Sequence, residues 1–338
     1  MNLEFFSGKR ILITGGTGSL GQALTERLLS LDVGSIRILS RNESKQVEMQ
    51  KKFSDGRLNY FIGDIRDLPR LIRSFEDVDI VFHTAALKHV PVIEYNPFEA
   101  VKTNVIGTQN VIDAAIEQDV EIVVGIGTDK AVSPLNTYGA SKLLMEKLIT
   151  SAHNFVNPIR HKTKFIALRY GNVLGSSGSV FPTWKEQIRN NQKITITEPT
   201  MTRFSITMNE ALDFILESSS TSHGGEILVP KINAYGIMDL KNAIFELLKN
   251  TGEEITGIRP AEKIHEILIA DNEIRYTWEL ENKFVIFNPT MPEEKIRELY
   301  PTIKKTTDIP SYSSEFAEKL SQSNLTKMLK NSKMINDN

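Results

Sequence analysis

The sequence predicts an α/β protein built on a Rossmann-type, doubly wound parallel sheet, with a smaller, interleaved C-terminal α/β substrate lobe. Three observations indicate this fold. Short apolar runs rich in Ile and Val alternate with helix-length segments through the first half of the chain, which is typical of strand–helix–strand units in a parallel sheet. A glycine-rich turn directly follows the first run. After Gly171 the alternation gives way to stretches rich in Gly, Ser, Pro and Thr.

The apolar runs place the elements in order. Strands are predicted over residues 10–14, 35–40, 59–62, 79–83, 121–126 and 164–169, with helices over 20–31, 97–117 and 138–152. Further along, we expect helices over 209–218 and 239–249 and strands over 265–269 and 283–287. The polar tail carries a few apolar residues at helical spacing, which predict a weak helix and a frayed end: Phe316, Leu320, Leu325, Met328 and Leu329.

Composition excludes several classes of protein. Forty Lys and Arg against 42 Asp and Glu leave a net charge of −2 over 338 residues, too balanced for a broad surface that binds nucleic acid. The absence of cysteine excludes disulfides, thiolate metal sites and cysteine nucleophiles, and we expect no metal. No apolar run approaches the ~20 residues that span a bilayer. The sequence therefore predicts a cytoplasmic protein with no nucleic-acid or membrane partner.

A glycine turn marks a nucleotide site. Glycines follow one another at every third position directly after the first strand, where a helix should begin: Gly15, Thr17, Gly18, Ser19, Leu20 and Gly21. Such a turn lets the backbone approach a pyrophosphate, and the helix N-terminus offers free N–H groups. A tight turn that merely needs glycine dihedrals is the alternative interpretation.

The end of the second strand bears on which dinucleotide binds. An NAD site usually has Asp or Glu ~20 residues after the glycine turn, whereas this chain has Ser40 and Arg41, with Lys45 one turn later. Arg41 would pair with a 2′-phosphate, which favours NADP; a solvated basic loop is the alternative. Asp64 follows another strand and would either accept from the adenine amino group or cap the next helix.

Tyr138 and Lys142 are spaced i, i+4, so they share one helical face. A lysine beside a phenol favours the phenolate and a lower tyrosine pKa. Thr128, which follows the strand over 121–126, would share the proton at the carboxyl edge of the sheet. The same spacing at Tyr300 and Lys304 includes a proline and lies at no strand end, so we interpret it as chance.

Together, the glycine turn, Thr128, Tyr138 and Lys142 resemble the extended short-chain dehydrogenase/reductase family. Within it, blocks in the same order over most of the chain are similar to the UDP-N-acetylglucosamine 4,6-dehydratases. The resemblance is to the inverting enzymes of pseudaminic acid synthesis, because other members carry Met in place of Tyr138. The family commonly has Ser where this chain has Gly127. The similar blocks cover residues 83–94, 128–132, 169–180, 201–204, 225–231 and 257–263.

The resemblance implies a mechanism. Hydride leaves C4 for NADP⁺ while Tyr138, supported by Lys142, takes the hydroxyl proton and Thr128 orients that group. Lys130 would then remove the C5 proton as the base, and Asp129 would protonate the departing C6 hydroxyl. Hydride returns to C6, and C5 is protonated from the opposite face. We predict a lowered pKa for Lys130, from burial beside the nicotinamide and Lys142. A surface turn with ordinary charges is the alternative for Asp129 and Lys130.

The resemblance also implies the ligand contacts. Ile65, Ala85 and Ala86 complete the NADP site. The substrate, UDP-N-acetylglucosamine, would be bound by Lys88, Asn172, Val180, Arg203, Lys231, Arg259 and Glu262, although the charged members could equally be surface charges. A retaining 4,6-dehydratase, a C4 epimerase and a non-catalytic NADP-binding module stay open as alternatives. A homo-oligomer is expected, paired through the helices over 97–117 and 138–152.

These expectations divide the chain into three parts. Residues 1–171 form the NADP-binding domain, to which a later segment at about 204–230 returns. Residues 172–310 form the discontinuous UDP-sugar lobe, and residues 311–338 form the polar tail.

Overall fold

The computed structural model describes residues 3–155, 157, 160–175, 180–259, 261–306 and 309–331. Gly178, Ser179 and Pro260, which belong to the similar blocks, and the predicted frayed end over 332–338 lie outside the described residues. Within the described part, no helix combines the length and apolar character needed to cross a bilayer.

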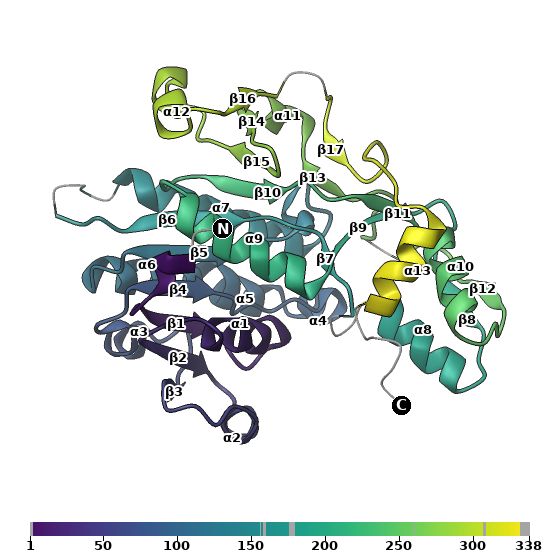
Figure 1. Cartoon of the computed structure of the whole chain (residues 1–338), viewed down its shortest axis with the longest axis horizontal. Helices are drawn as coiled ribbons and strands as arrows, with labels where there is room; N and C mark the ends of the chain where they lie inside the picture. Colours follow the sequence, from purple (N-terminus) through teal and green to yellow (C-terminus); the bar gives the residue numbers. More distant parts are fainter. Residues whose placement is uncertain are drawn as a thin grey trace.

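Ten strands of the described chain form the main sheet (Figure 1), in the order β16-β14-β15-β10-β6-β5-β4-β1-β2-β3. The seven strands from β10 to β3 are all parallel, and β15, β14 and β16 add to β10 as antiparallel strands. The strand bounds are β1 Arg10–Thr14, β2 Ser35–Ser40, β3 Leu58–Ile62, β4 Ile80–His83, β5 Ile122–Ile126, β6 Lys164–Leu168, β10 Ile227–Pro230, β14 Thr277–Glu279, β15 Lys283–Ile286 and β16 Lys304–Lys305.

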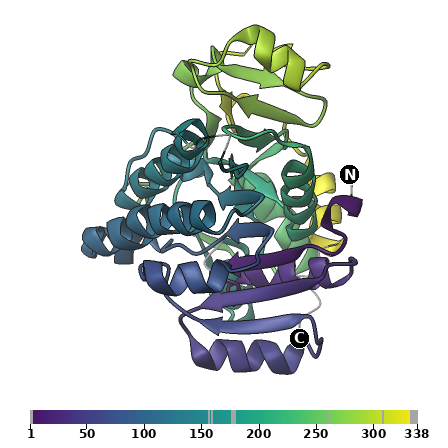
Figure 2. The same cartoon turned by 90° about the vertical axis from the view of Figure 1, so that its left-hand side faces the viewer.

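Helices cover both faces of this sheet (Figure 2). On one face, α1 (Ser19–Leu29) and α9 (Met208–Thr221) pack Leu24 and Ile215 against the strands. On the other face, α3 (Leu68–Phe75), α6 (Gly107–Glu117) and α7 (Thr137–Phe155) bury Phe75, Val111 and Ile149. The central strands are apolar along their whole length because both of their faces are covered. The Rossmann-type doubly wound fold is therefore confirmed.

The helix predicted over 97–117 departs from a regular α-helix. It follows α4 (Val90–Tyr95) and consists of α5 (Pro97–Ala100), a π-helical segment η2 (Val101–Ile106) and α6. π-Helical turns inside α-helices are rare and occur mostly at functional sites. Here the wide turn contains Asn104, whose buried amide donates to the Leu87 carbonyl and the Ser141 hydroxyl. Apolar spacing alone does not distinguish such a turn from an ordinary one.

Residues beyond 171 build smaller sheets and also extend the main one. Because β10, β14, β15 and β16 belong to the main sheet, that sheet continues across the boundary predicted at residue 171. The remaining elements are the three-stranded sheet β11 (Ala234–Gly236), β9 (Thr202–Ile206) and β7 (Asn172–Val173), the pairs β12 (Glu253–Ile255) with β8 (Ile194–Ile196) and β13 (Ile267–Ile269) with β17 (Tyr312–Ser313), and the helices α2 (Glu43–Lys52), α8 (Val180–Arg189), α10 (Ile237–Leu247), α11 (Asp271–Ile274), α12 (Glu293–Leu299) and α13 (Gln322–Asn331).

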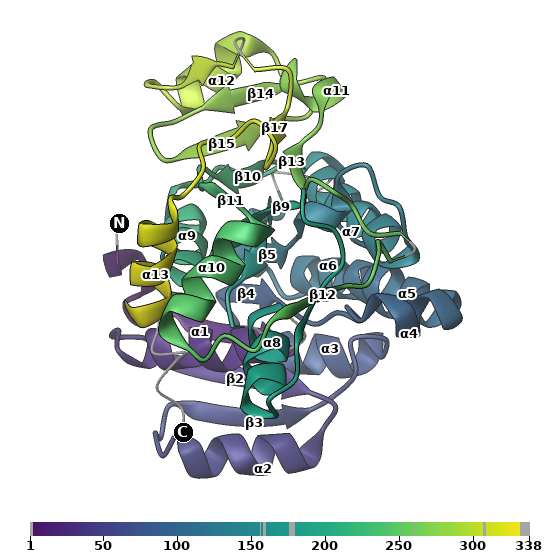
Figure 3. The same cartoon turned by 90° about the vertical axis from the view of Figure 1, so that its right-hand side faces the viewer.

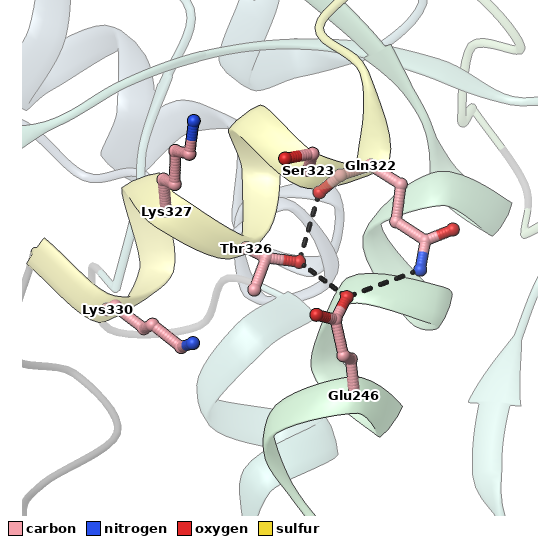
Figure 4. A pocket seen from close by; sticks show the side chains of 6 residues that line it. All are labelled: Glu246, Gln322, Ser323, Thr326, Lys327 and Lys330. Carbon is pink, nitrogen blue, oxygen red and sulfur yellow. Dashed lines mark hydrogen bonds between the residues drawn. The ribbon is translucent and has the colours of Figure 1, made fainter.

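The tail forms a helix that packs against the rest of the protein. Helix α13 lies along α10 (Figure 3), and Leu325 and Leu329 are fully buried between them. In Figure 4, the Thr326 hydroxyl donates to Glu246 Oε2 over 3.0 Å. Phe316, which shares the predicted helical spacing, lies outside the helix and is 67% exposed. The burial of Leu325 and Leu329 explains why this polar segment is helical.

Candidate active site

A cavity of about 880 Å³ opens at the carboxyl ends of the parallel strands. Open α/β sheets bind ligands at this edge. Loops that follow β1 to β6 all contribute to the lining, so the topology gathers residues that are distant in sequence. The predicted site residues among the lining are Gly15, Thr17, Gly18, Ser19, Leu20, Gly21, Ser40, Arg41, Lys45, Asp64, Ile65, Ala85, Ala86, Lys88, Thr128, Tyr138, Lys142 and Asn172.

The glycine turn allows another backbone segment to approach it closely. Gly15 has a φ of +68°, and a Cβ atom there would lie 2.8 Å from Ala85 Cα. The backbone of the loop after β4 therefore approaches Gly15 too closely for a side chain there. Helix α1 begins after Gly18, which has no side chain to cap the first turn. The N–H groups at the start of α1 lie at the cavity and suit an anionic group such as a pyrophosphate.

The ends of β2 and β3 bring Arg41 and Asp64 together. The Arg41 side chain is 55% exposed, and its Nη1 lies 3.8 Å from Asp64 Oδ2. Asp64 also accepts from Arg66, and hydrogen bonding to Arg66 outweighs partial burial and lowers the pKa of this carboxyl. The helix-cap alternative for Asp64 is wrong, because Asp67 caps α3 by accepting from the Arg70 backbone. Asp64 instead faces the cavity.

Thr128, Tyr138 and Lys142 converge where β5 meets the start of α7. Both Tyr138 and Lys142 are buried, and the Thr128 hydroxyl lies within hydrogen-bonding reach of the phenol. Lys142 Nζ donates to the Ile126 carbonyl over 2.5 Å, which fixes the ammonium beneath the strand end. The second Tyr–Lys spacing does not reach the cavity, because the Tyr300 hydroxyl donates to the buried Glu226.

The charge environment of Tyr138 differs from the one that the sequence predicted. Desolvation lowers the pKa of Lys142 to about 8. Burial raises the pKa of Tyr138, and the cation that opposes this rise is Lys130. The expectation that Lys142 lowers the tyrosine pKa is therefore not met here, because the Lys142 ammonium is directed at the Ile126 carbonyl.

Asp129 and Lys130 form a tight cluster beside Tyr138, not a solvated surface turn. Asp129 is buried, and Lys130 Nζ lies 3.1 Å from both of its carboxylate oxygens and 3.1 Å from Asn172 Oδ1. Desolvation favours the neutral amine, but the Asp129 and Glu266 carboxylates outweigh it and raise the pKa of Lys130. The predicted lowering is therefore wrong in this structure. The largest opposing effect comes from the adjacent Asp129 carboxylate; Glu266, which immediately precedes β13, adds to it, and Lys142 points elsewhere.

Sequence reasoning missed Glu266, Asn104 and Lys263 as members of this region. Glu266 is buried just before β13 and accepts from Asn172 over 2.8 Å. Lys263 donates to the Val132 carbonyl next to the same cluster. The signal available for Glu266 was a carboxylate beside the apolar run Ile267-Leu268-Ile269. That pattern is common and does not reveal which charges meet it in space.

The predicted substrate residues divide into two groups. Lys88 and Asn172 line the cavity, and Arg203 lies next to the cluster, with Nε 3.7 Å from Glu266 Oε1. Glu262 accepts from the Arg259 backbone and pairs with Arg203; Arg259 is exposed. Val180 begins α8. The structure does not bring Lys231 to the cavity, because it pairs with Glu279 and lies over Phe284.

A match to a family model along most of the chain identifies its family. Residues 11–288 match the family described as polysaccharide biosynthesis protein. The chain belongs to this family. It is thus an extended short-chain dehydrogenase/reductase of the dehydratase and epimerase group, as its sequence blocks predicted.

The relatives of this chain include a dehydratase and an epimerase. The inverting UDP-N-acetylglucosamine 4,6-dehydratase of Campylobacter jejuni serotype O:23/36 is 47% identical over 283 residues, 83% of each chain. The UDP-glucose 4-epimerase of Rickettsia bellii (strain OSU 85-389) is 40% identical over 286 residues, 83% of each chain. The X-ray structure of Pen from Bacillus thuringiensis has a TM-score of 0.89 at 38% identity, covering 98% of this chain and 99% of that one.

Proposed function

We propose that this protein is an NADP-dependent UDP-N-acetylglucosamine 4,6-dehydratase that inverts C5. It is a lyase, and its product is a UDP-2-acetamido-2,6-dideoxy-4-keto-L-hexose for nucleotide-sugar biosynthesis of the pseudaminic acid type. The observation that carries this proposal is the contact of Lys130 with Asp129 directly after Thr128, beside Tyr138. A base and an acid at that place suit removal of water from a ketone. The identity with the Campylobacter dehydratase supports the same reaction.

The cofactor end supports NADP by its residues. Gly15, Gly18 and the start of α1 leave room and free N–H groups for the pyrophosphate, and exposed Arg41 at the end of β2 suits a 2′-phosphate. NADP, when bound, supplies a hydride acceptor at C4 and returns the hydride at C6. Asp64, beside Arg41, suits the adenine amino group.

The first proton transfer belongs to Tyr138. Tyr138 accepts the C4 hydroxyl proton in its phenolate form, Thr128 orients that hydroxyl, and Lys142 holds the strand end against which both lie. Burial excludes water from the phenol and strengthens each of these contacts.

The second and third transfers belong to Lys130 and Asp129. The C4 ketone acidifies the C5 proton, which the Lys130 amine accepts while Asp129 protonates the departing C6 hydroxyl. Each positioned proton transfer contributes roughly 10²–10⁴-fold to the rate. C5 is then protonated from the opposite face, which inverts it.

The sugar nucleotide is held from the second half of the chain. We assign the diphosphate to Arg203 and Arg259, and polar contacts to Asn172, Glu262 and the Val180 backbone. Lys88 lines the cavity in the loop that follows β4.

Two other reactions compete with this proposal. The name of the Rickettsia relative favours a C4 epimerase, which needs no acid and base for C5 and C6 and so would leave Asp129 and Lys130 without a task. A retaining dehydratase would use the same pair and differ only in the face that protonates C5. A non-catalytic module would need neither Tyr138 nor Lys142, yet both are buried together at the cavity.

One experiment tests the proposal. Purified protein is incubated with UDP-N-acetylglucosamine in D₂O and the products are followed by NMR. A 6-deoxy-4-keto product with deuterium at an inverted C5 is expected. Lys130→Ala should abolish it, whereas Lys304→Ala, which changes an exposed lysine of the second Tyr–Lys spacing, should not. A 4-epimer, a retained C5 or unchanged substrate contradicts the proposal.

A further inference from the structure

A second carboxyl group lies directly behind the Asp129–Lys130 pair. Glu266 is 5% exposed, and its side chain is in hydrogen-bonding contact with that of Asp129. Its Oε1 lies 4.0 Å from Lys130 Nζ and accepts from Asn172 Nδ2 over 2.8 Å. Asn172 in turn accepts from Lys130 over 3.1 Å. Glu266 therefore touches both groups assigned to the loss of water.

Hydrogen bonds to two other segments fix the position of Glu266. Its Oε2 accepts from the Phe204 N–H over 3.0 Å, and its own N–H donates to Ser314 Oγ over 2.8 Å. Glu266 is thus held against Asp129 by β9 and by the β13–β17 pair. A chance contact at the surface would not have these supporting hydrogen bonds.

On the basis of the function proposed above, we infer that Asp129 and Glu266 form a carboxyl pair that shares one proton. Glu266 acts through Asp129 as a positioning residue, and it keeps this proton available for the departing C6 hydroxyl. A second negative charge on two buried carboxyl groups in contact is unfavourable, so the pair binds one proton more tightly than a lone carboxyl does. In agreement, burial and the Asp129 carboxylate raise the pKa of Glu266 to about 7.

The surrounding charges set where the proton lies. The groups that face Glu266 are Asp129 and Lys130 from η3 (Asp129–Ala131), Arg203 from β9, Tyr235 from β11 and Lys263 from the loop before β13. Lys130 and Arg203 lower the pKa of Glu266, but they do not cancel the effects of burial and of Asp129.

Glu266 solves a problem that Asp129 and Lys130 have on their own. Burial opposes the ionisation of Asp129, but Lys130 and the Thr128 hydroxyl outweigh it and lower the pKa of this carboxyl, so Asp129 on its own holds no proton to give. Glu266, whose pKa is raised, holds a proton in hydrogen-bonding contact with Asp129. Asp129 takes this proton from Glu266 and passes it to the departing C6 hydroxyl. Lys130 reacts in its neutral form.

The chemical step then balances within the cluster. The Lys130 amine forms an N–H bond as the C5–H bond breaks, and those electrons form the C5–C6 double bond as the C6–O bond breaks. The shared proton leaves Asp129 and completes a water molecule with the departing hydroxyl. The carboxyl pair is now doubly anionic and Lys130 is an ammonium, so the total charge is unchanged. Lys130 returns its proton to Asp129 across the 3.1 Å contact, which resets the cluster.

A change of leaving group tests this role. Fluoride leaves without a proton, so UDP-6-deoxy-6-fluoro-N-acetylglucosamine needs the base but not the acid. Glu266→Gln should slow loss of water from the 6-hydroxy substrate at least about 10²-fold and leave loss of fluoride and the KM within about threefold. Lys130→Ala should slow both. Glu253→Gln, the same change at a half-exposed ion pair with Lys241, should slow neither.

The unmodified protein gives a second measurement, which does not depend on the folding of a variant. The ratio of water loss to fluoride loss should fall as the pH rises through about 7, where the carboxyl pair loses its proton. Equal impairment of Glu266→Gln on both substrates, or a flat ratio in the unmodified protein, overturns the inference. Protein that releases neither water nor fluoride overturns the proposed dehydratase function itself, which is a distinct result.

Discussion

Glu146 and Arg169 form an ion pair in which both side chains are fully buried, with Oε2 and Nη2 2.7 Å apart. Arg169 extends from the end of β6 and also bonds Glu273 and the Leu268 carbonyl, so one guanidinium connects α7, α11 and β13. The pair lies directly under Gly127, where a Cβ atom would stand 2.5 Å from Glu146 Oε1 and 2.6 Å from the Leu168 carbonyl. This contact explains why glycine occupies a position where the family commonly has serine.

Gly127→Ser should therefore destabilise the protein. The added side chain must displace the Glu146 carboxylate or the β6 backbone, and such overpacking costs about 1–3 kcal/mol. Denaturant unfolding measures the change. Gly56→Ser is the matched control, because a Cβ at Gly56 meets nothing within 4 Å. Equal unfolding free energies for the two variants would contradict the packing argument.

Lys142→Met should abolish turnover and yet stabilise the fold. Burial lowers the pKa of Lys142 from 10.5 to about 8, so the folded state holds an unfavourable ammonium at pH 7. Replacing it should raise the free energy of unfolding by up to about 3 kcal/mol, less the lost bond to Ile126. Lys147→Met, at an exposed site of the same helix, should change stability little.

The sign of the pH dependence follows from the lowered pKa. Between pH 8 and 10.5 the unfolded chain binds more protons at Lys142 than the folded protein, so unmodified protein gains stability as pH rises. The advantage of Lys142→Met should therefore shrink over this window. Paired denaturation curves at about pH 7 and pH 10 measure it, and an advantage that grows with pH would contradict the buried ammonium.

The Asp129–Glu266 carboxyl pair should make stability fall as the pH rises, which is opposite to the effect of Lys142. The pKa of Glu266 is raised from 4.5 to about 7, so the folded protein keeps a proton that the unfolded chain releases. Stability relative to Glu266→Gln should fall as pH rises from 4.5 to 7, and then level off. The same paired denaturation curves check this without substrate or turnover. A constant difference across the window would mean that Asp129 and Glu266 do not share a proton.

Arg41→Ala should weaken NADP binding and spare NAD binding. A charge-assisted bond to the 2′-phosphate is worth about 1.5–3 kcal/mol, which corresponds to roughly a 10–100-fold loss of NADP affinity. Titration calorimetry with both dinucleotides measures the ratio. Lys51→Ala, at an exposed site on α2, serves as the control. Unchanged NADP affinity would show that Arg41 is only a solvated charge.

We propose that the apolar face on α4, α5, η2 and α7 binds a second copy of the chain. Tyr95 is 89% exposed and Phe98 62% exposed, and Ile106 and Leu144 are also exposed. Tyr95→Asp should reduce the mass measured by light scattering during gel filtration, whereas Phe316→Asp, at an exposed phenylalanine of the tail, should not. A monomeric unmodified protein would contradict this pairing.

Local patterns predicted the sheet and the cofactor end. Strands β1, β4, β5 and β6 are mostly apolar because helices cover both faces of the sheet, and that burial is visible in the sequence as apolar runs. The glycine turn and the Tyr138–Lys142 spacing involve neighbours within one element, so their geometry follows from helix and turn rules alone. These features are the ones that the structure brings to the cavity.

Electrostatics could not be predicted in the same way. The pKa of Lys130 is raised by Asp129 and by Glu266, which immediately precedes β13, and the pKa of Tyr138 is raised by burial and opposed by Lys130, while the Lys142 ammonium is directed at Ile126. The π-helical turn at Asn104 was also hidden, since it keeps the same apolar spacing. Lys231 was assigned to substrate from its block alone, and only the structure reveals its Glu279 partner.

The hydrogen bonds between Glu266 and Ser314 have a consequence for the order of synthesis. A growing chain that has left the ribosome as far as residue 170 already holds the strands and glycine turn of the dinucleotide half. Glu266, to which we assign the support of Asp129, is anchored only once the segment around Ser314 emerges and pairs β17 with β13. On the function proposed above, a prematurely ended chain would bind a dinucleotide but would lack this support for the loss of water.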